Sequence, residues 1–132
     1  MEISEMVADT SIFIEYLRAK KKENTILQNL PNNTELCIST ITMYELFMGA
    51  KNQEKWTEVY KLIEDLVTFR FDHKVAILSA KIYHQLRKDN KMIEFRDIFI
   101  ATTAIHNKLP LLTLNKKDFS RIKNLKIVQL GH

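Results

Sequence analysis

The chain contains few of the residues that interrupt regular structure or cross-link it. Of its 132 residues, two are glycine, two are proline and one, Cys37, is cysteine. So few glycines and prolines favour long helices and strands joined by short connections. A single cysteine excludes a disulfide within the chain, and we therefore expect a reduced, cytoplasmic protein.

Long apolar runs are also absent. No run approaches the roughly 20 apolar residues that a membrane helix needs, so we expect no membrane span. The first five residues, Met1 to Glu5, lack the basic start and apolar core of a signal peptide. Hydrophobic residues nevertheless make up 45% of the chain, which excludes a disordered protein. The length predicts one domain over residues 1–132.

Basic side chains only slightly outnumber acidic ones. The chain has 20 basic and 16 acidic side chains, which gives a formal net charge of +4. Such a balance allows a polyanionic partner but does not require one. The function must therefore be sought in particular residues rather than in the overall charge.

Apolar patterns predict helices and strands in alternation. We expect strands at 5–8, 36–38, 68–71, 109–114 and 126–129, and helices at 10–17, 41–48, 53–67, 74–88, 95–107 and 116–121. This order predicts an α/β fold, a three-layer α/β/α sandwich with a mostly parallel central sheet. In such sheets ligands bind beyond the carboxyl ends of the strands, where the strand order reverses.

Four acidic residues occupy positions that this fold could bring together. Asp9 follows the apolar run 6–8, and Glu45 lies early in the helix after the second strand. Asp97 lies in the first turn of its helix, and Asp118 follows the strand at 109–114. If the strands at 5–8 and 109–114 are neighbours, these side chains share one edge of the sheet.

Acids gathered in this way need a counter-charge. Two carboxylates about 5 Å apart repel by roughly 3 kcal/mol at an effective dielectric constant near 20. One of them would take up a proton unless a cation lay between them. Mg²⁺ and Mn²⁺ prefer oxygen ligands and would remove the conflict. A metal site of this kind suits phosphodiester hydrolysis, because the metal activates water and offsets charge on the phosphate.

Each acid also has an ordinary interpretation. Asp9 and Asp118 could cap helices, Asp97 could interact with a helix dipole, and Glu45 could be a solvated helix residue. The residue pattern alone leaves a metal site and these structural roles open.

Four segments together resemble a known family. They are Ala-Asp-Thr-Ser at 8–11, Ile-Ser-Thr-Ile-Thr-Met-Tyr-Glu-Leu at 38–46, Asp-Ile-Phe-Ile-Ala-Thr-Thr-Ala at 97–104, and Leu-Thr-Leu-Asn-Lys-Lys-Asp-Phe at 112–119. In this order they resemble the PIN-domain family, most closely its VapC-type toxins, over nearly the whole chain. No single block is very specific, and their shared order carries the resemblance.

The resemblance implies a Mg²⁺- or Mn²⁺-dependent endoribonuclease, the toxin of a type II toxin–antitoxin pair. Its partners would be RNA, a cognate antitoxin and a second copy of the chain. The acidic site that it implies consists of Asp9, Glu45, Asp97 and Asp118, with Asp9 and Asp97 as the direct metal ligands. Polar residues expected to position these acids or the substrate are Thr113, Asn115, Ser11 and Ser39.

The chain departs from the family pattern at two places. Thr102-Thr103 replace a pair of small residues, and Asp89-Asn90 stand where many members have glycine. Asn tolerates the left-handed backbone, so a turn at Asn90 can survive. Glu94 is an additional acid near Asp97, and it could either join the site or be a solvated helix start.

Basic and aromatic residues suggest two binding surfaces, each with a structural alternative. Arg96, Lys116 and Lys117 adjoin the acids and are candidates for RNA phosphate contacts, although such residues also form solvated faces. A groove for a partner helix could be lined by Phe13, Tyr16, Trp56 and Tyr60. Burial of these four in the core is the favoured interpretation.

Three other functions are compatible with an α/β sheet. A receiver-like phosphoacceptor would need a second acid beside the first, but Thr10 and Ser11 follow Asp9. A haloacid-dehalogenase-like phosphatase would need an acid at position 11. A non-catalytic RNA-binding module on the same fold would not need all four acids, and their presence argues against it.

Overall fold

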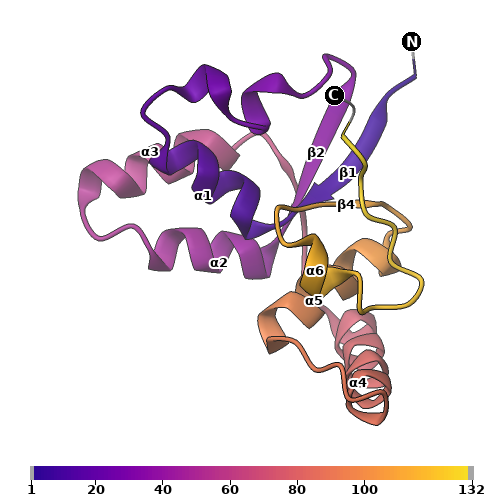
Figure 1. Cartoon of the computed structure of the whole chain (residues 1–132). Helices are drawn as coiled ribbons and strands as arrows, with labels where there is room; N and C mark the ends of the chain where they lie inside the picture. The colour runs from indigo at the N-terminus through magenta and orange to yellow at the C-terminus, as the bar shows by residue number, and fades with distance from the viewer. Residues whose placement is uncertain (1, 131–132) are drawn as a thin grey trace.

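The computed structural model describes residues 2–130 as helices packed around one sheet (Figure 1). The strands are β1 (Ser4–Ala8), β2 (Thr34–Ser39), β3 (Val67–Phe69) and β4 (Leu111–Leu112). The α-helices are α1 (Thr10–Arg18), α2 (Thr40–Met48), α3 (Gln53–Ile63), α4 (His73–Lys88), α5 (Phe95–His106) and α6 (Lys116–Phe119). Two 3₁₀ turns, η1 (Lys22–Asn24) and η2 (Leu27–Asn29), connect α1 to β2.

All four strands are parallel, in the order β3-β2-β1-β4. β1 pairs with β4 through Val7–Leu111 and Ala8–Leu112. The chain therefore builds outward from β1 to β3 and then returns to the other side of β1. The strand order reverses between β1 and β4, which is where ligands bind in such sheets. The condition under which the four acids would share one edge, that these two strands are neighbours, is therefore met.

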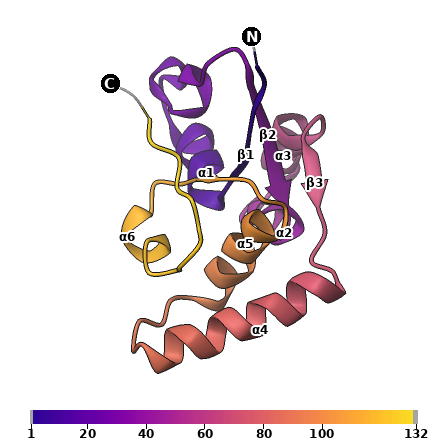
Figure 2. The same ribbon diagram turned by 90° about the vertical axis from the view of Figure 1, so that its right-hand side faces the viewer.

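Successive strand residues face opposite layers of helices, which confirms the three-layer prediction. Val7, Cys37 and Leu111 pack in a cluster with residues of α4 and α5. Their neighbours Ala8, Ile38 and Leu112 pack in a second cluster with α1, α2 and α3. Figure 1 shows α1, α2 and α3 to the left of β1 and β2 and α4 and α5 to their lower right, and Figure 2 shows β1, β2 and β3 side by side. The sheet is therefore buried on both faces, as parallel sheets require.

The helices begin where strands end because polar residues cap them there. Asp9 caps α1 directly after β1, and Ser39 caps α2 directly after β2. Each side chain accepts a hydrogen bond from a backbone N–H of the first turn. After the carboxyl end of α4, Asn90 adopts a φ of 56°. The predicted break at 89–90 is therefore confirmed, and asparagine takes the left-handed conformation in place of glycine.

The strand predicted at 126–129 is wrong. Only one isolated bridge forms there, between Leu111 and Ile127, and it is parallel. The backbone N–H of Leu111 donates to Lys126, and that of Val128 donates to Leu111. Because β4 is only two residues long, it offers too little edge for a further strand.

The aromatic residues divide between core and surface. Phe13 is fully buried, which confirms its favoured interpretation. Burial of Trp56 and Tyr60 was wrongly predicted, since these side chains are 46% and 57% exposed. Val59 and Ile63 lie on the same side of α3 as these two residues, but only Val59 and Ile63 are buried. Trp56 and Tyr60 lie at the edge of that side, where their rings contact Phe47 of α2 and stay partly in solvent.

Two expectations from composition can be compared with the fold. Within residues 2–130, no helix is both long and apolar enough to cross a membrane. Cys37 is buried in β2, where burial raises the pKa of its thiol to about 11. The thiol therefore stays protonated and unreactive at neutral pH.

Candidate active site at the carboxyl edge of the sheet

Asp9 is buried at the point where β1 and β4 diverge, and hydrogen bonds hold both of its carboxylate oxygens. Oδ1 accepts from the backbone N–H and the hydroxyl of Ser11, at 3.1 Å and 2.5 Å. Oδ2 accepts from the hydroxyl of Thr113 at 2.6 Å. The structure thus places Ser11 and Thr113 against Asp9, where the sequence predicted positioning residues.

The same hydroxyl groups tie the loop after β4 to Asp9. Ser11 Oγ accepts from the backbone N–H of Leu114 at 3.0 Å, and Thr113 Oγ1 accepts from that of Asn115 at 2.9 Å. Burial raises the pKa of Asp9, while the hydrogen bonds from Ser11 and Thr113 oppose that rise. The carboxylate is therefore fixed in orientation but poorly solvated, so a nearby positive charge would stabilise it.

The pKa of Asp97 indicates that the four acids lie near one another. It lies in the first turn of α5, where the helix dipole favours a negative charge. Its pKa is nevertheless raised to about 6, first by burial and then by the charges of other carboxylates. Those carboxylates belong to Asp9, Glu45, Asp118 and Glu94. The edge of the sheet is thus a region of concentrated negative charge with Asp97 near its middle.

Glu45 reaches this edge from α2 and is held by two partners. Thr10 donates a hydrogen bond to its Oε1 at 2.6 Å, and Arg96 Nη1 lies 3.2 Å from its Oε2. Arg96, predicted as a phosphate contact, thus forms an ion pair with one of the acids while its side chain stays 50% exposed. Sequence reasoning missed the contact of Thr10, although its position directly after Asp9 at a helix start was a usable signal.

Asp118 is oriented from its own turn. Its Oδ2 accepts a hydrogen bond at 3.1 Å from the side-chain amide of Asn115, which lies just before α6. Asn115 is therefore beside the last acid, as the sequence predicted. Lys116 and Lys117 are exposed on α6. Their contact with RNA stays a prediction.

Glu94 and Ser39 lie at two helix starts and differ in exposure. The Glu94 side chain is 71% exposed and lies 3.9 Å from Arg96. It adds to the negative potential at Asp97 from a solvated position. Ser39 is buried, and its hydroxyl accepts from the backbone N–H of Thr42 at 3.0 Å. Ser39 therefore fixes the start of the helix that carries Glu45.

The donor set fits a hard divalent cation, although the side chains do not form a closed cage. Its oxygens are all carboxylate oxygens, and after burial it is their mutual repulsion that raises the pKa of Asp97. Within residues 2–130, no three Asp, Glu, His or Cys side chains are placed to hold one ion. Glu45 and Asp118 are turned toward other partners. Magnesium often keeps several waters and binds only one or two protein carboxylates directly.

Nearly the whole chain matches one known protein family. Residues 6–125 match the PIN domain. The chain is 35% identical over 124 residues to Ribonuclease VapC1 of Methanocaldococcus jannaschii, covering 92% of this chain and 84% of that protein. It is 33% identical over 132 residues to Ribonuclease VapC of Rickettsia bellii, with 93% and 94% covered.

Solved structures agree with this relationship. VapBC2 from Rickettsia felis, bound to a DNA fragment from its promoter, has a chain that matches with a TM-score of 0.80 at 25% identity. The match covers 96% of this chain and 99% of that one. VapBC-1 from nontypeable Haemophilus influenzae matches with a TM-score of 0.77 at 28% identity, with 94% and 96% covered. The chain therefore belongs to the PIN-domain family and, within it, to the VapC-type ribonucleases.

Proposed function

We propose that the chain is an endoribonuclease that uses Mg²⁺ or Mn²⁺ and is the toxin of a type II toxin–antitoxin pair, with residues 1–132 as one catalytic domain. The observation that carries the proposal is the gathering of carboxylates around Asp97, whose pKa is raised to about 6 first by burial and then by the charges of those carboxylates. Such a concentration of negative charge is unfavourable for the protein alone and favourable once a cation is bound.

Asp9 and Asp97 are the residues that would hold the cation. The hydrogen bonds from Ser11 and Thr113 fix the Asp9 carboxylate before any ligand arrives, so little reorganisation is needed. When bound, the cation supplies a Lewis acid that activates water and offsets charge on the phosphate. Glu45 and Asp118 would complete the pocket, either through water or as a general base.

Positive side chains around the acids would hold the RNA backbone. Arg96 is half exposed beside Glu45, and Lys116 and Lys117 are exposed on α6. Contacts of this kind are electrostatic and weaken as salt is added. They would bring the phosphodiester next to the acidic edge without selecting a sequence.

The proposal is tested by cleavage of total RNA. Wild type is expected to cleave in the presence of Mg²⁺ or Mn²⁺ and to stop when EDTA is added. Asp9→Asn should be inactive, whereas Asp65→Asn, a change at an exposed acid just after α3, should cleave like wild type. Cleavage that continues in EDTA, or full activity of Asp9→Asn, would overturn the mechanism.

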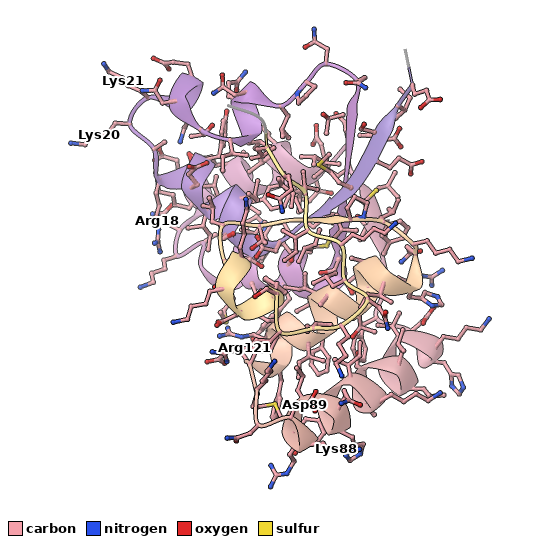
Figure 3. The ribbon with its side chains drawn as sticks, turned by 45° about the vertical axis from the view of Figure 1, so that its right-hand side comes forward. Arg18, Lys20, Lys21, Lys88, Asp89 and Arg121 are labelled. Carbon is pink, nitrogen blue, oxygen red and sulfur yellow. The ribbon has the colours of Figure 1, made fainter. Side chains whose placement is uncertain are left out.

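The proposed antitoxin would bind a cavity between α1, α2 and α3. This cavity is about 370 Å³ in volume and has an apolar floor that includes Leu17, Leu46 and Val59. Arg18, Lys51, Lys55, Glu45 and Glu58 also line it. Figure 3 shows Arg18, Lys20 and Lys21 extending outward near the end of α1. An amphipathic helix could bury its apolar face here, and because Glu45 lines the cavity, a bound partner would lie beside the acidic site.

Binding of the antitoxin to this cavity is tested by measuring inhibition of the ribonuclease. We expect the full-length antitoxin to lower both the metal affinity and the ribonuclease activity of wild type, with a basic side chain inserted among the acids. Leu17→Asp should weaken the inhibition, measured against the variant's own uninhibited activity. Ile3→Asp, which changes an exposed residue just before β1, should not weaken the inhibition. An antitoxin that binds without affecting metal affinity or activity would contradict the proposal.

We also propose that the protein is a homodimer and cytoplasmic. A dimer would have about twice the 15.6 kDa mass of one chain. Sedimentation of the purified protein over a range of concentrations tests this, and a monomer throughout the range would contradict it.

A further inference from the structure

A second pocket shares a wall with the acidic site. It is about 460 Å³ in volume and is lined by Met92, Ile93, Glu94, Phe95 and Asp118. Asp118 belongs to both places, because its charge also acts on Asp97. Anything bound in this pocket would therefore lie next to the edge where RNA cleavage is proposed.

Phe95 lines this pocket with an aromatic ring that is held in place by a neighbour and is still exposed to solvent. It is the first residue of α5 and is 60% exposed. Its ring packs edge-on against Tyr83 of α4, with centroids 5.9 Å apart and planes at 64°. An exposed phenylalanine forgoes much of the stabilisation that burial would give. The contact with Tyr83 restricts the ring, while the rest of its surface remains available to a ligand.

The position of Phe95 on the helix places it beside the acids rather than among them. Residues two apart on a helix do not share a face. Phe95 and Asp97 therefore point to different sides of the first turn of α5. A group stacked on Phe95 would therefore lie beside a group bound at Asp97, and Asp118 is close to both places.

The charges that line this pocket favour a nucleobase over a phosphate. Its two ionisable lining residues, Glu94 and Asp118, are both acids. They repel a phosphate but can accept hydrogen bonds from the N–H groups of a base. Guanidinium groups lie close by, because Arg96 follows Phe95 and Arg121, labelled in Figure 3, donates to the carbonyl of Met92 at 3.0 Å. These groups suit the phosphates on either side of such a base.

We propose that Phe95 is a stacking platform for the base next to the scissile phosphodiester, and that the pocket at 92–95 with Asp118 is the subsite for that base. The inference rests on the proposed ribonuclease function and adds a substrate subsite to it. Single-stranded RNA is commonly held by stacking of its bases on exposed aromatic rings. Phe95 would contribute to binding and to the choice of cleavage position, without taking part in the chemical step.

Steady-state kinetics on an RNA oligonucleotide that wild type cleaves at one mapped site tests the proposal. Phe95→Leu is expected to raise KM roughly 5- to 150-fold and leave kcat nearly unchanged, the range that one stacked base gives. Phe95→Trp should stay close to wild type because it can still stack. Ile3→Ala, which shortens a side chain of similar exposure just before β1, should have no effect.

A substrate that lacks one base identifies the contact. The same RNA is made with an abasic nucleotide at each position flanking the cleavage site. At one position the abasic RNA should impair wild type and Phe95→Trp but impair Phe95→Leu no further. Equal losses in wild type and Phe95→Leu at every position would overturn the subsite. If Phe95→Leu fails to fold, abasic RNA that impairs neither wild type nor Phe95→Trp at any flanking position would still overturn the subsite.

Three other outcomes distinguish failure of the base subsite from failure of the proposed ribonuclease function. If Phe95→Leu changes the sedimentation of the protein instead of KM, a second copy covers the ring and the base subsite is wrong. If cleavage requires Asp9 but is indifferent to both Phe95 and the abasic positions, the subsite alone fails. If wild type cleaves no RNA at all, the ribonuclease proposal fails.

Discussion

Replacing Asp97 with asparagine should stabilise the metal-free protein while removing its activity. Burial raises the pKa of this carboxyl group most, and the nearby charges of Asp9, Glu45 and Asp118 raise it further. Asparagine keeps the size of the side chain and removes the charge. In EDTA the variant should therefore fold more stably than wild type at neutral pH, although it has lost a proposed metal ligand.

The size and pH range of this effect follow from the pKa. The rise from 3.8 to about 6 corresponds to at most about 3 kcal/mol at 1.36 kcal/mol per unit, and screening by solvent reduces it to about 1–2 kcal/mol. Since the pKa is raised on folding, the stability of wild type is highest below the unfolded pKa and is lost as pH rises through about 6. The variant should not show this loss.

Urea denaturation of both proteins in EDTA, at a series of pH values, measures the difference. The stability gained by Asp97→Asn should be near zero at about pH 4 and reach its full size above about pH 6. Mg²⁺ at about 100 times its Kd should then add about 2.7 kcal/mol to wild type and much less to the variant. A variant that is less stable than wild type in EDTA at neutral pH would refute the claim of clustered charge.

Other substitutions probe the supports of the site. Thr113→Val removes the hydrogen bond to Asp9 and should cost about 1.5–3 kcal/mol in urea denaturation and lower kcat, whereas Thr113→Ser should retain both. Ser39→Ala removes the cap of α2 and should lower stability by about 1 kcal/mol, with kcat unchanged well below the unfolding temperature. Arg96→Gln should weaken RNA binding and reduce the slope of log affinity against log salt by about 1, measured by fluorescence anisotropy. An unchanged slope would mean that Arg96 serves only its ion pair with Glu45.

The place of Asp9 was predictable because it depends on local pattern. A short apolar run predicts a buried strand, and a capping residue directly after it must lie at the carboxyl end of that strand. The same reasoning applies to Thr113 after β4. The pairing of β1 with β4, separated by about a hundred residues, is not encoded in local periodicity. From the sequence, that pairing could be stated only as a condition.

The partners of the side chains were not predictable, because they depend on how helices cross. The ion pair of Arg96 with Glu45 joins α5 to α2, and the hydrogen bond of Thr10 to Glu45 joins α1 to α2. No local sequence pattern indicates that these residues are in contact. Ser39 shows the opposite problem, because a serine after a strand is equally suited to a site and to a helix cap.

Exposure was predicted least well where a helix is only partly covered. The apolar pattern of α3 includes Trp56 and Tyr60, yet Val59 and Ile63 are the residues of that helix that are buried. Periodicity indicates the direction of an apolar face but not its width. The strand expected at 126–129 failed for a related reason, since a suitable apolar pattern still needs a neighbouring edge long enough to pair with.

The central claim is that Asp9 and Asp97 bind a divalent cation, and proton release during Mn²⁺ titration tests it most directly. Calorimetry near pH 6, in two buffers of different ionisation enthalpy, measures metal binding and proton release together. Because Asp97 is about half protonated there, the account predicts release of about half a proton from wild type on binding. It also predicts little release at about pH 8, and greatly weakened binding to Asp9→Asn and Asp97→Asn. Binding of equal strength by wild type and both variants, or binding near pH 6 without proton release, would contradict it.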